Sequence, residues 1–157
     1  MDNPNVVVKQ INHSMKHPDD NIRFFPGRQM NEIHFSVRGP QNTIFHKGWY
    51  HGVLLLPKEY PFKPPNVRLL TKSGRFETNT NLCFSFTSFH PESWSPAVNL
   101  NAIIIALQSL FDDWDERAVG MITFPSKSEI AKCAEKSKEY ECQICGAKHK
   151  EINKQMA

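Results

Sequence analysis

Four extended segments between residues 21 and 70 restrict the fold more than any other feature of the sequence. Residues 31–39, NEIHFSVRG, alternate strictly between apolar and polar side chains, which is typical of a β-strand with one buried face. Residues 49–57 and 66–70 predict a more buried strand and a shorter one, and residues 21–27 predict an edge strand. Because the connections between them are short, the sequence predicts a four-stranded antiparallel meander.

A proline-rich segment, KEYPFKPPN at residues 58–66, separates the last two predicted strands. Proline fixes its own φ and donates no hydrogen bond to a sheet, so this segment is expected to be a stiff surface crossing. Residues 71–97 follow without any sustained periodicity, although they include four Phe and one Trp. A loop this long is usually functional, and its aromatic residues argue against disorder.

Helical periodicity predicts three helices, at residues 4–16, at residues 99–111, and from Ser126 or Ser128 to about Tyr140. In the second, apolar residues recur at i, i+3, i+4 and i+7 after Asn99, a favourable N-cap. That helix is expected to lie against the sheet. The fold class is therefore α/β of the α+β type: an N-terminal helix, the meander, a long loop, and central and C-terminal helices.

Length and composition narrow the class of protein. The chain of 157 residues is expected to form one compact domain over residues 1–141, followed by a frayed polar tail at residues 142–157. A net charge of +3 is too small to predict nucleic-acid binding. No apolar run reaches the roughly 18 residues that a membrane span needs. The start, MDNPNVVVKQ, lacks the pattern of a secretory signal, so free thiols in a reducing cytosol are expected.

Cys83 is the candidate reactive group because it lies inside the long irregular loop. Hydrogen-bonding side chains surround it in the sequence: Asn79, Asn81, Ser85, Thr87, Ser88 and His90. A thiol that carries an acyl group needs such donors for the oxyanion of each tetrahedral intermediate. A buried structural cysteine is the alternative. His90 could act as a base, or it could be a hydrogen-bonded loop histidine held extended by Pro91.

The order of these parts resembles the ubiquitin-conjugating enzymes. The resemblance runs from about residue 4 to residue 125 and includes YPFKPP, a single cysteine in a loop, WSPA, and an amphipathic helix. Within the family, Gly74, Arg75 and Phe76, followed by HPESW after the cysteine, are similar to the J-type branch. Members of that branch are held in the endoplasmic-reticulum membrane by a C-terminal tail, and any such anchor would have to lie outside residues 1–157.

This resemblance implies the ubiquitin-conjugating-enzyme fold and the activity of a ubiquitin carrier. Cys83 would accept ubiquitin, or a ubiquitin-like modifier, as a thioester from the activating enzyme. It would then transfer the modifier to a lysine or hydroxyl group of a protein substrate, guided by a RING-type ligase. A thioester stays reactive without a cofactor, so none is expected. The expected location is the cytoplasm, at the cytosolic face of the endoplasmic-reticulum membrane if a tail anchor belongs to the protein. The expected pathway is the degradation associated with that membrane.

The resemblance also assigns the remaining site residues. The family has an Asn that serves the oxyanion or orders the loop, and Ser73 stands at its position. A hydroxyl is a weaker and shorter donor than an amide. Either Ser73 with loop backbone amides substitutes, or the enzyme is slow on lysine, or Asn79, Asn81 or His90 takes over, which is the preferred expectation. Phe62 and the tip formed by Ser95, Pro96 and Ala97 would contact the ligase, with a core position as the alternative for Phe62. The acids expected to form a gate beside the cysteine, or merely a solvated charge run, are Asp112, Asp113, Asp115 and Glu116.

The last segment has half of a zinc motif. Cys142, Cys145 and His149 have ligand-like spacing, but a structural zinc site needs four ligands. Cys133 or an external group would have to supply the fourth, so the sequence alone predicts no metal. Two further functions stay open at this point: a ubiquitin-binding module without catalysis, and a hydrolase that uses Cys83 and His90.

Overall fold

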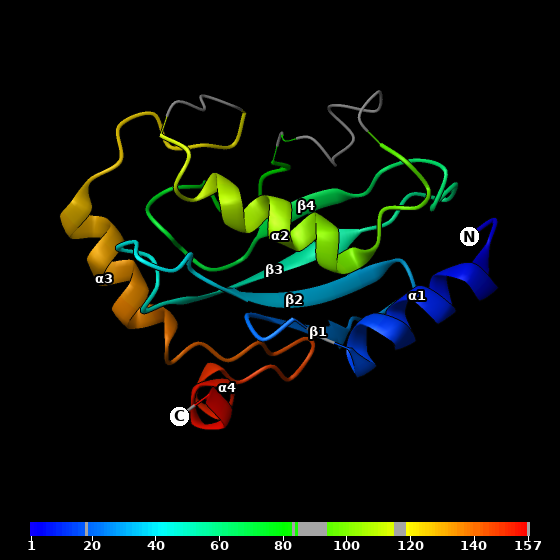
Figure 1. The fold of residues 1–157 in the computed structure, drawn as a ribbon, viewed down its shortest axis with the longest axis horizontal. Coiled ribbons are helices and arrows are strands. Elements are labelled where there is room, and N and C mark those ends of the chain that lie inside the picture. Colours follow the sequence, from blue (N-terminus) through cyan, green and yellow to red (C-terminus); the bar gives the residue numbers. More distant parts are fainter. Residues whose placement is uncertain (18, 83, 85–93, 115–118, 157) are drawn as a thin grey trace.

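The computed structural model describes residues 1–17, 19–82, 84, 94–114 and 119–156. Within these ranges, one four-stranded sheet is flanked by four helices (Figure 1). In chain order the elements are α1 (Pro4–Lys16), β1 (Ile22–Pro26), β2 (Glu32–Arg38), β3 (Trp49–Leu55), β4 (Asn66–Leu69), α2 (Leu100–Leu110), α3 (Lys127–Ser137) and α4 (His149–Met156). No helix of the described part of the chain is long and apolar enough to cross a membrane.

The sheet is the predicted antiparallel meander. Its strands are hydrogen-bonded in the order β1-β2-β3-β4, and Phe35 in the second strand pairs with Phe24 on one side and with Gly52 on the other. A Cβ at Gly52 would lie 2.5 Å from the Phe35 ring and 2.4 Å from the Arg68 carbonyl oxygen. Glycine therefore lets the ring of Phe35 cross the neighbouring strand.

The hydrophobic core lies between the sheet and α2. Ile33, Phe35 and Val37 on β2 are buried in one cluster with Ile103 and Leu107 on α2. Asn99 caps this helix, since its Oδ1 accepts a hydrogen bond from the Ala102 amide at 2.8 Å. The predicted cap and buried helix face are both confirmed, because apolar spacing and cap chemistry agree with each other.

The opposite face of the sheet is also buried, which corrects the prediction of a strand with one solvated face. His34 and Ser36 on β2 and His51 on β3 are all 0% exposed. They alternate with the core residues as predicted, but the segment that follows α3 covers them. This segment contains a bridge between Glu141 and Lys148 before α4 begins.

The expectation of a frayed tail is therefore wrong for residues 142–156. Cys142, Ala147, His149 and Ile152 are buried, and α4 begins at His149. The sequence pattern concealed this because the segment has few large apolar residues, so its burial depends on polar contacts with the sheet. The division of the chain at residue 141 stays a prediction.

The last predicted helix begins where expected and ends earlier. Ser126 caps α3 by accepting from the Glu129 amide at 3.4 Å. The helix ends at Ser137 rather than near Tyr140. The Ser137 hydroxyl donates to the Ala134 carbonyl at 2.7 Å and accepts from the Trp49 amide at 3.1 Å. These bonds join the end of α3 to the start of β3.

Candidate functional site

The predicted nucleophile Cys83 lies outside the described residues, as do His90, Asp115 and Glu116. Backbone hydrogen bonds hold the chain that leads to Cys83. The Asn79 amide donates to the Leu69 carbonyl at 2.8 Å, and the Leu82 amide donates to the Val67 carbonyl at 2.9 Å. The segment before the cysteine is thus hydrogen-bonded along β4 and its end.

Asn81 presents an amide two residues before Cys83. Its Oδ1 accepts a hydrogen bond from Arg68 Nε at 2.6 Å, and the side chain is partly exposed. Among the described residues no hydrogen-bond partner is found for its Nδ2. Because Arg68 occupies the oxygen, the orientation of the amide is fixed and the nitrogen keeps its two donor protons. This arrangement suits a group that donates to an oxyanion.

Ser73 has a different environment. It is 0% exposed, and its Oγ accepts hydrogen bonds from the amides of Arg75 and Phe76, both at 3.1 Å. Gly74, between Ser73 and Arg75, has a φ of +80°, which glycine adopts without strain. The hydroxyl oxygen of Ser73 is therefore engaged in its own turn, as Ser hydroxyls often are. Its role as a donor stays a prediction, and these contacts favour a structural role.

Arg75 joins this turn to the loop after α2 that carries Asp112 and Asp113, called the acidic loop below. Its side chain is 0% exposed, and Nη2 donates to the Asp113 carbonyl at 2.6 Å. The guanidinium also lies 4.9 Å from the centre of the Trp114 ring, a cation–π distance. Of the predicted gate, Asp112 and Asp113 are exposed. Sequence reasoning used Arg75 only as a motif match and missed this anchor, because nothing in its spacing indicates that the guanidinium is buried.

The two predicted ligase-contact tips lie next to each other. Phe62 is 65% exposed, so the alternative of a core position is wrong. Ser95, Pro96 and Ala97 are exposed as well. Trp94 connects the tips, since its Nε1 donates to the Pro61 carbonyl at 2.8 Å. The geometry therefore offers a two-part exposed surface, and the ligase contact itself stays a prediction.

The half zinc motif has different partners from those its spacing suggested. His149 does not face the cysteines: its Nδ1 lies 2.7 Å from the Ser137 carbonyl and its Nε2 lies 2.8 Å from Ser36 Oγ. Cys133 Sγ lies 3.7 Å from Glu129 on the same helix. Instead, Cys142 and Cys145 face two histidines from the sheet.

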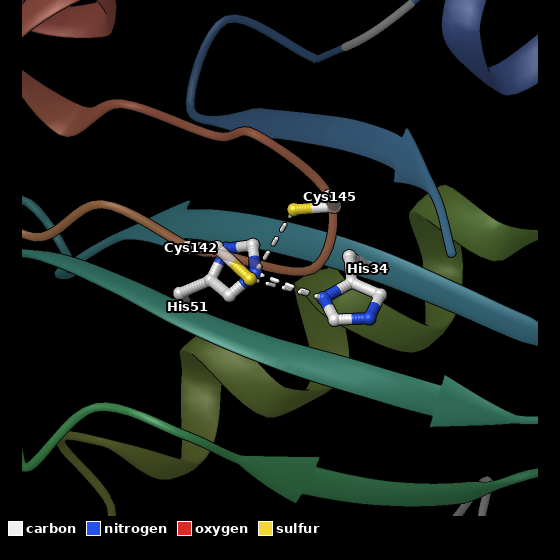
Figure 2. Close-up of side chains that lie close together, drawn as sticks. All are labelled: His34, His51, Cys142 and Cys145. Carbon is white, nitrogen blue, oxygen red and sulfur yellow. Dashed lines mark hydrogen bonds between the residues drawn. The ribbon is translucent and has the colours of Figure 1, made fainter. Parts of the chain in front are cut away.

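These two histidines are His34 and His51 (Figure 2). Burial, followed by the neighbouring His149, lowers the pKa of His51 to about 3. Burial also lowers the pKa of His34, although Glu32 opposes that shift. Both imidazoles are thus in surroundings that favour the neutral form, which is the form that binds metals. Sequence reasoning missed them because it read their face of the strand as solvated.

Comparison with known proteins identifies related sequences and a related fold. The family model described as "Ubiquitin-conjugating enzyme" matches residues 6–147. The chain is 38% identical over 134 residues to "Ubiquitin-conjugating enzyme E2 32" of Arabidopsis thaliana, covering 85% of this chain and 43% of that one. It is 36% identical over 139 residues to "Ubiquitin-conjugating enzyme E2 J1" of Homo sapiens, covering 88% and 43%.

A solved structure, that of human Ubiquitin-conjugating enzyme E2 G1, superposes with a TM-score of 0.61 at 22% identity, covering 71% of this chain and 95% of that one. At this identity the likeness concerns the fold alone. The chain spans less than half the length of the two curated relatives.

Proposed function

The chain belongs to the ubiquitin-conjugating enzyme family, and from this premise we propose that Cys83 carries ubiquitin as a thioester. The observation that supports this most is the family match over residues 6–147, which spans Cys83 and the anchored chain before it. The partners would be ubiquitin, the activating enzyme, a RING-type ligase and protein substrates.

The proposed chemistry consists of two acyl transfers. The Cys83 thiolate attacks the carbonyl carbon of the thioester that joins ubiquitin's terminal glycine to the activating enzyme, and the cysteine of that enzyme leaves as a thiolate. An acceptor amine or hydroxyl then attacks the new thioester and loses its proton, and Cys83 leaves as a thiolate. A cysteine with a pKa near its ordinary value of about 8.5 has some thiolate at neutral pH.

Reconstitution tests this proposal. The protein is mixed with ubiquitin, activating enzyme and ATP, and is then run on a gel without reductant. An adduct that disappears when thiol is added supports a ubiquitin carrier. Binding of ubiquitin without any adduct would indicate the non-catalytic module instead, and thioester loss without transfer to an acceptor would indicate hydrolysis.

Asn81 provides the first test of the site. We propose that its Nδ2 donates to the oxyanion or orders the loop beside it. The substitution Asn81→Asp keeps an oxygen for Arg68 but replaces the donor by a second acceptor, whereas Asn81→Ala removes both. Both variants should load with ubiquitin and then transfer it to free lysine about 100-fold more slowly, the usual loss for one oxyanion donor.

The measurement is single-turnover discharge of the preloaded thioester. His90→Ala, measured in parallel, shows whether that residue contributes as well. A discharge rate for Asn81→Asp equal to that of the wild type would exclude the donor role, because this variant retains the bond to Arg68.

Phe62 provides a test of the ligase contact. An exposed aromatic side chain beside a second exposed tip is the type of anchor that dominates protein interfaces. Phe62→Ala should leave loading by the activating enzyme unchanged and should lower RING-stimulated discharge at least about tenfold. The assay uses an isolated RING domain chosen because it stimulates the wild type.

The matched control is Phe124→Ala, since Phe124 is also exposed, at 90%, but lies just before α3. Equal losses in the two variants would mean that removal of any exposed aromatic residue impairs the assay, and the assignment to Phe62 would fail.

A location at the endoplasmic reticulum is a finer proposal. It is supported by the resemblance of residues 74–76 and 90–94 to the tail-anchored branch, and by the similarity to E2 J1. Substrates in the associated degradation pathway would follow from that location. Fractionation of membranes from cells that express the complete protein tests it, and recovery of the protein away from that membrane would contradict it.

A further inference from the structure

Three buried side chains and one partly buried side chain converge on the face of the sheet opposite α2. His34 comes from β2, His51 from β3, and Cys142 and Cys145 from the loop between α3 and α4 (Figure 2). One nitrogen or sulfur atom of each lies within 4.8 Å of those of the others. These residues take no part in the proposed ubiquitin transfer, so their convergence needs a separate explanation.

Three distances between these atoms are close to the edges of a zinc tetrahedron, and all the others are at most 4.8 Å. Zn–N distances of about 2.0 Å and Zn–S distances of about 2.3 Å give edges of roughly 3.3 Å between nitrogens and roughly 3.6 Å between nitrogen and sulfur. His34 Nδ1 lies 3.1 Å from His51 Nε2, Cys145 Sγ lies 3.4 Å from the same Nε2, and Cys142 Sγ lies 3.7 Å from His34 Nδ1. An ion at the centre therefore requires only small shifts of the side chains.

A chain of hydrogen bonds determines which nitrogen of His51 faces the cluster as a lone pair. The Ser137 carbonyl can only accept, so His149 Nδ1 donates to it at 2.7 Å. Nε2 of a neutral His149 must then accept from the Ser36 hydroxyl at 2.8 Å. The oxygen of Ser36 is left to accept from His51 Nδ1, also at 2.8 Å. His51 Nε2 thus carries no proton and can bind a metal.

His34 points to the same conclusion. In a cluster without metal, a proton on Nδ1 that is donated to His51 would leave Nε2 of the neutral ring as a bare lone pair. That atom is buried, has no hydrogen-bond partner among the described residues, and lies 3.5 Å from Glu32 Oε1. A metal on Nδ1 would instead leave a proton on Nε2 facing the carboxylate, the usual arrangement of a ligating histidine. A buried imidazolium without metal is the alternative.

The local backbone places both sulfurs on one side of a tight turn. The Gly146 amide donates to the Cys142 carbonyl, and the Cys142 amide donates to the Ala147 carbonyl, both at 2.9 Å. Gly146 has a φ of +78°, which glycine adopts readily. The Cys-x-x-Cys-Gly sequence thus forms a compact knuckle over the sheet.

We propose that His34, His51, Cys142 and Cys145 bind a zinc ion. The ion would fasten residues 138–156 to β2 and β3 on the face of the sheet opposite α2. Two thiolates and two imidazoles in a tetrahedron are a donor set that zinc prefers. Four protein ligands leave no open position for substrate, so the role is structural. This inference is independent of the thioester chemistry of Cys83.

The first experiment measures the metal in the wild-type chain. After equilibration with ZnCl₂ and removal of free ion, elemental analysis should find one zinc per chain. Replacement by Co²⁺ should produce the visible absorption of a tetrahedral site, together with thiolate-to-cobalt charge transfer. A wild-type chain that retains no zinc and produces no tetrahedral cobalt spectrum would overturn the proposal and favour the metal-free cluster.

Variants then locate the ion. Cys142→Ser, Cys145→Ser and His51→Asn should each lose the stoichiometric metal. Cys133→Ser, which removes another buried thiol, should retain it, and Cys83→Ala should also retain it. Full binding by the variant that lacks both Cys142 and Cys145, or loss of zinc on substitution of Cys133 or Cys83, would place the ion elsewhere.

Two further measurements remain informative if a ligand variant fails to fold. A mercurial that modifies thiols should release the zinc from folded wild-type protein, detected by a colorimetric chelator; if zinc is retained while the thiols are modified, thiolate ligation is wrong. Glu32→Gln keeps all four ligands but removes the carboxylate behind His34. It should weaken zinc binding about tenfold in competition with a chelator, and unchanged affinity would contradict the proposed protonation of His34.

Discussion

Cys83→Ser should trap ubiquitin on the protein in a form that resists reductant. In the presence of ubiquitin, activating enzyme and ATP, the wild-type adduct should disappear on a gel that contains thiol, whereas the adduct of the variant should persist. The reason is chemical: serine would form an oxygen ester, which thiols cleave far more slowly than a thioester. Cys83→Ala offers no nucleophile and should form no adduct.

Cys133→Ser is the matched control for this experiment. It removes a buried thiol on α3 and should leave a thiol-sensitive adduct of the wild-type amount. If the adduct formed equally well in Cys83→Ala, ubiquitin would be attached elsewhere and the proposed carrier role of Cys83 would be wrong.

Arg75→Ala should produce a large loss of stability. Truncation of this fully buried side chain leaves a cavity, removes the donor to the Asp113 carbonyl and removes the charge over Trp114. Truncation of a large buried side chain typically costs about 3 kcal/mol in the free energy of unfolding. For a chain of this size, that cost corresponds to a decrease in melting temperature of roughly 6–12 °C.

Thermal unfolding followed by circular dichroism measures this effect, and Arg75→Lys separates its causes. Lysine retains a charge and much of the volume but lacks the planar fork of donors, so its loss should be intermediate. A melting temperature for Arg75→Ala within about a degree of the wild type, on the same scale, would show that the buried guanidinium does not hold the acidic loop to the core.

The parts of the fold that depend on local pattern could be predicted from the sequence. The alternation around Phe35 and the short connections predict the meander, and Asn99 followed by apolar residues at helical spacing predicts the capped central helix. In these elements residues near one another in the chain determine the result, so a reading of local pattern is sufficient.

The metal cluster could not be predicted in the same way. His34 and Cys142 are 108 positions apart, and only the packing of the last segment brings them together. His149, at a plausible spacing from Cys145, is occupied by Ser36 and Ser137 instead. Sequence spacing could indicate two cysteine ligands, but it could not show that the polar face of a strand supplies the other two.

The candidate site around Cys83 lies between these cases. The exposure of Phe62 follows from its proline-rich surroundings. Ser73 and Asn81 differ in their surroundings. The Ser73 hydroxyl is buried and bonded within its own turn, whereas Arg68, 13 residues away, orients the Asn81 amide. Neither feature has a local sequence signal.

The bond from the Trp94 indole to the Pro61 carbonyl has a mechanical consequence. The bond lies behind the two exposed tips, Phe62 and residues 95–97, and fixes the distance between them. A partner that contacts both tips would therefore meet a preorganised surface. Binding of such a partner would cost less conformational entropy than binding to two loops that moved independently of each other. Loss of this hydrogen bond would weaken binding of such a partner even if the exposed contact residues stayed the same.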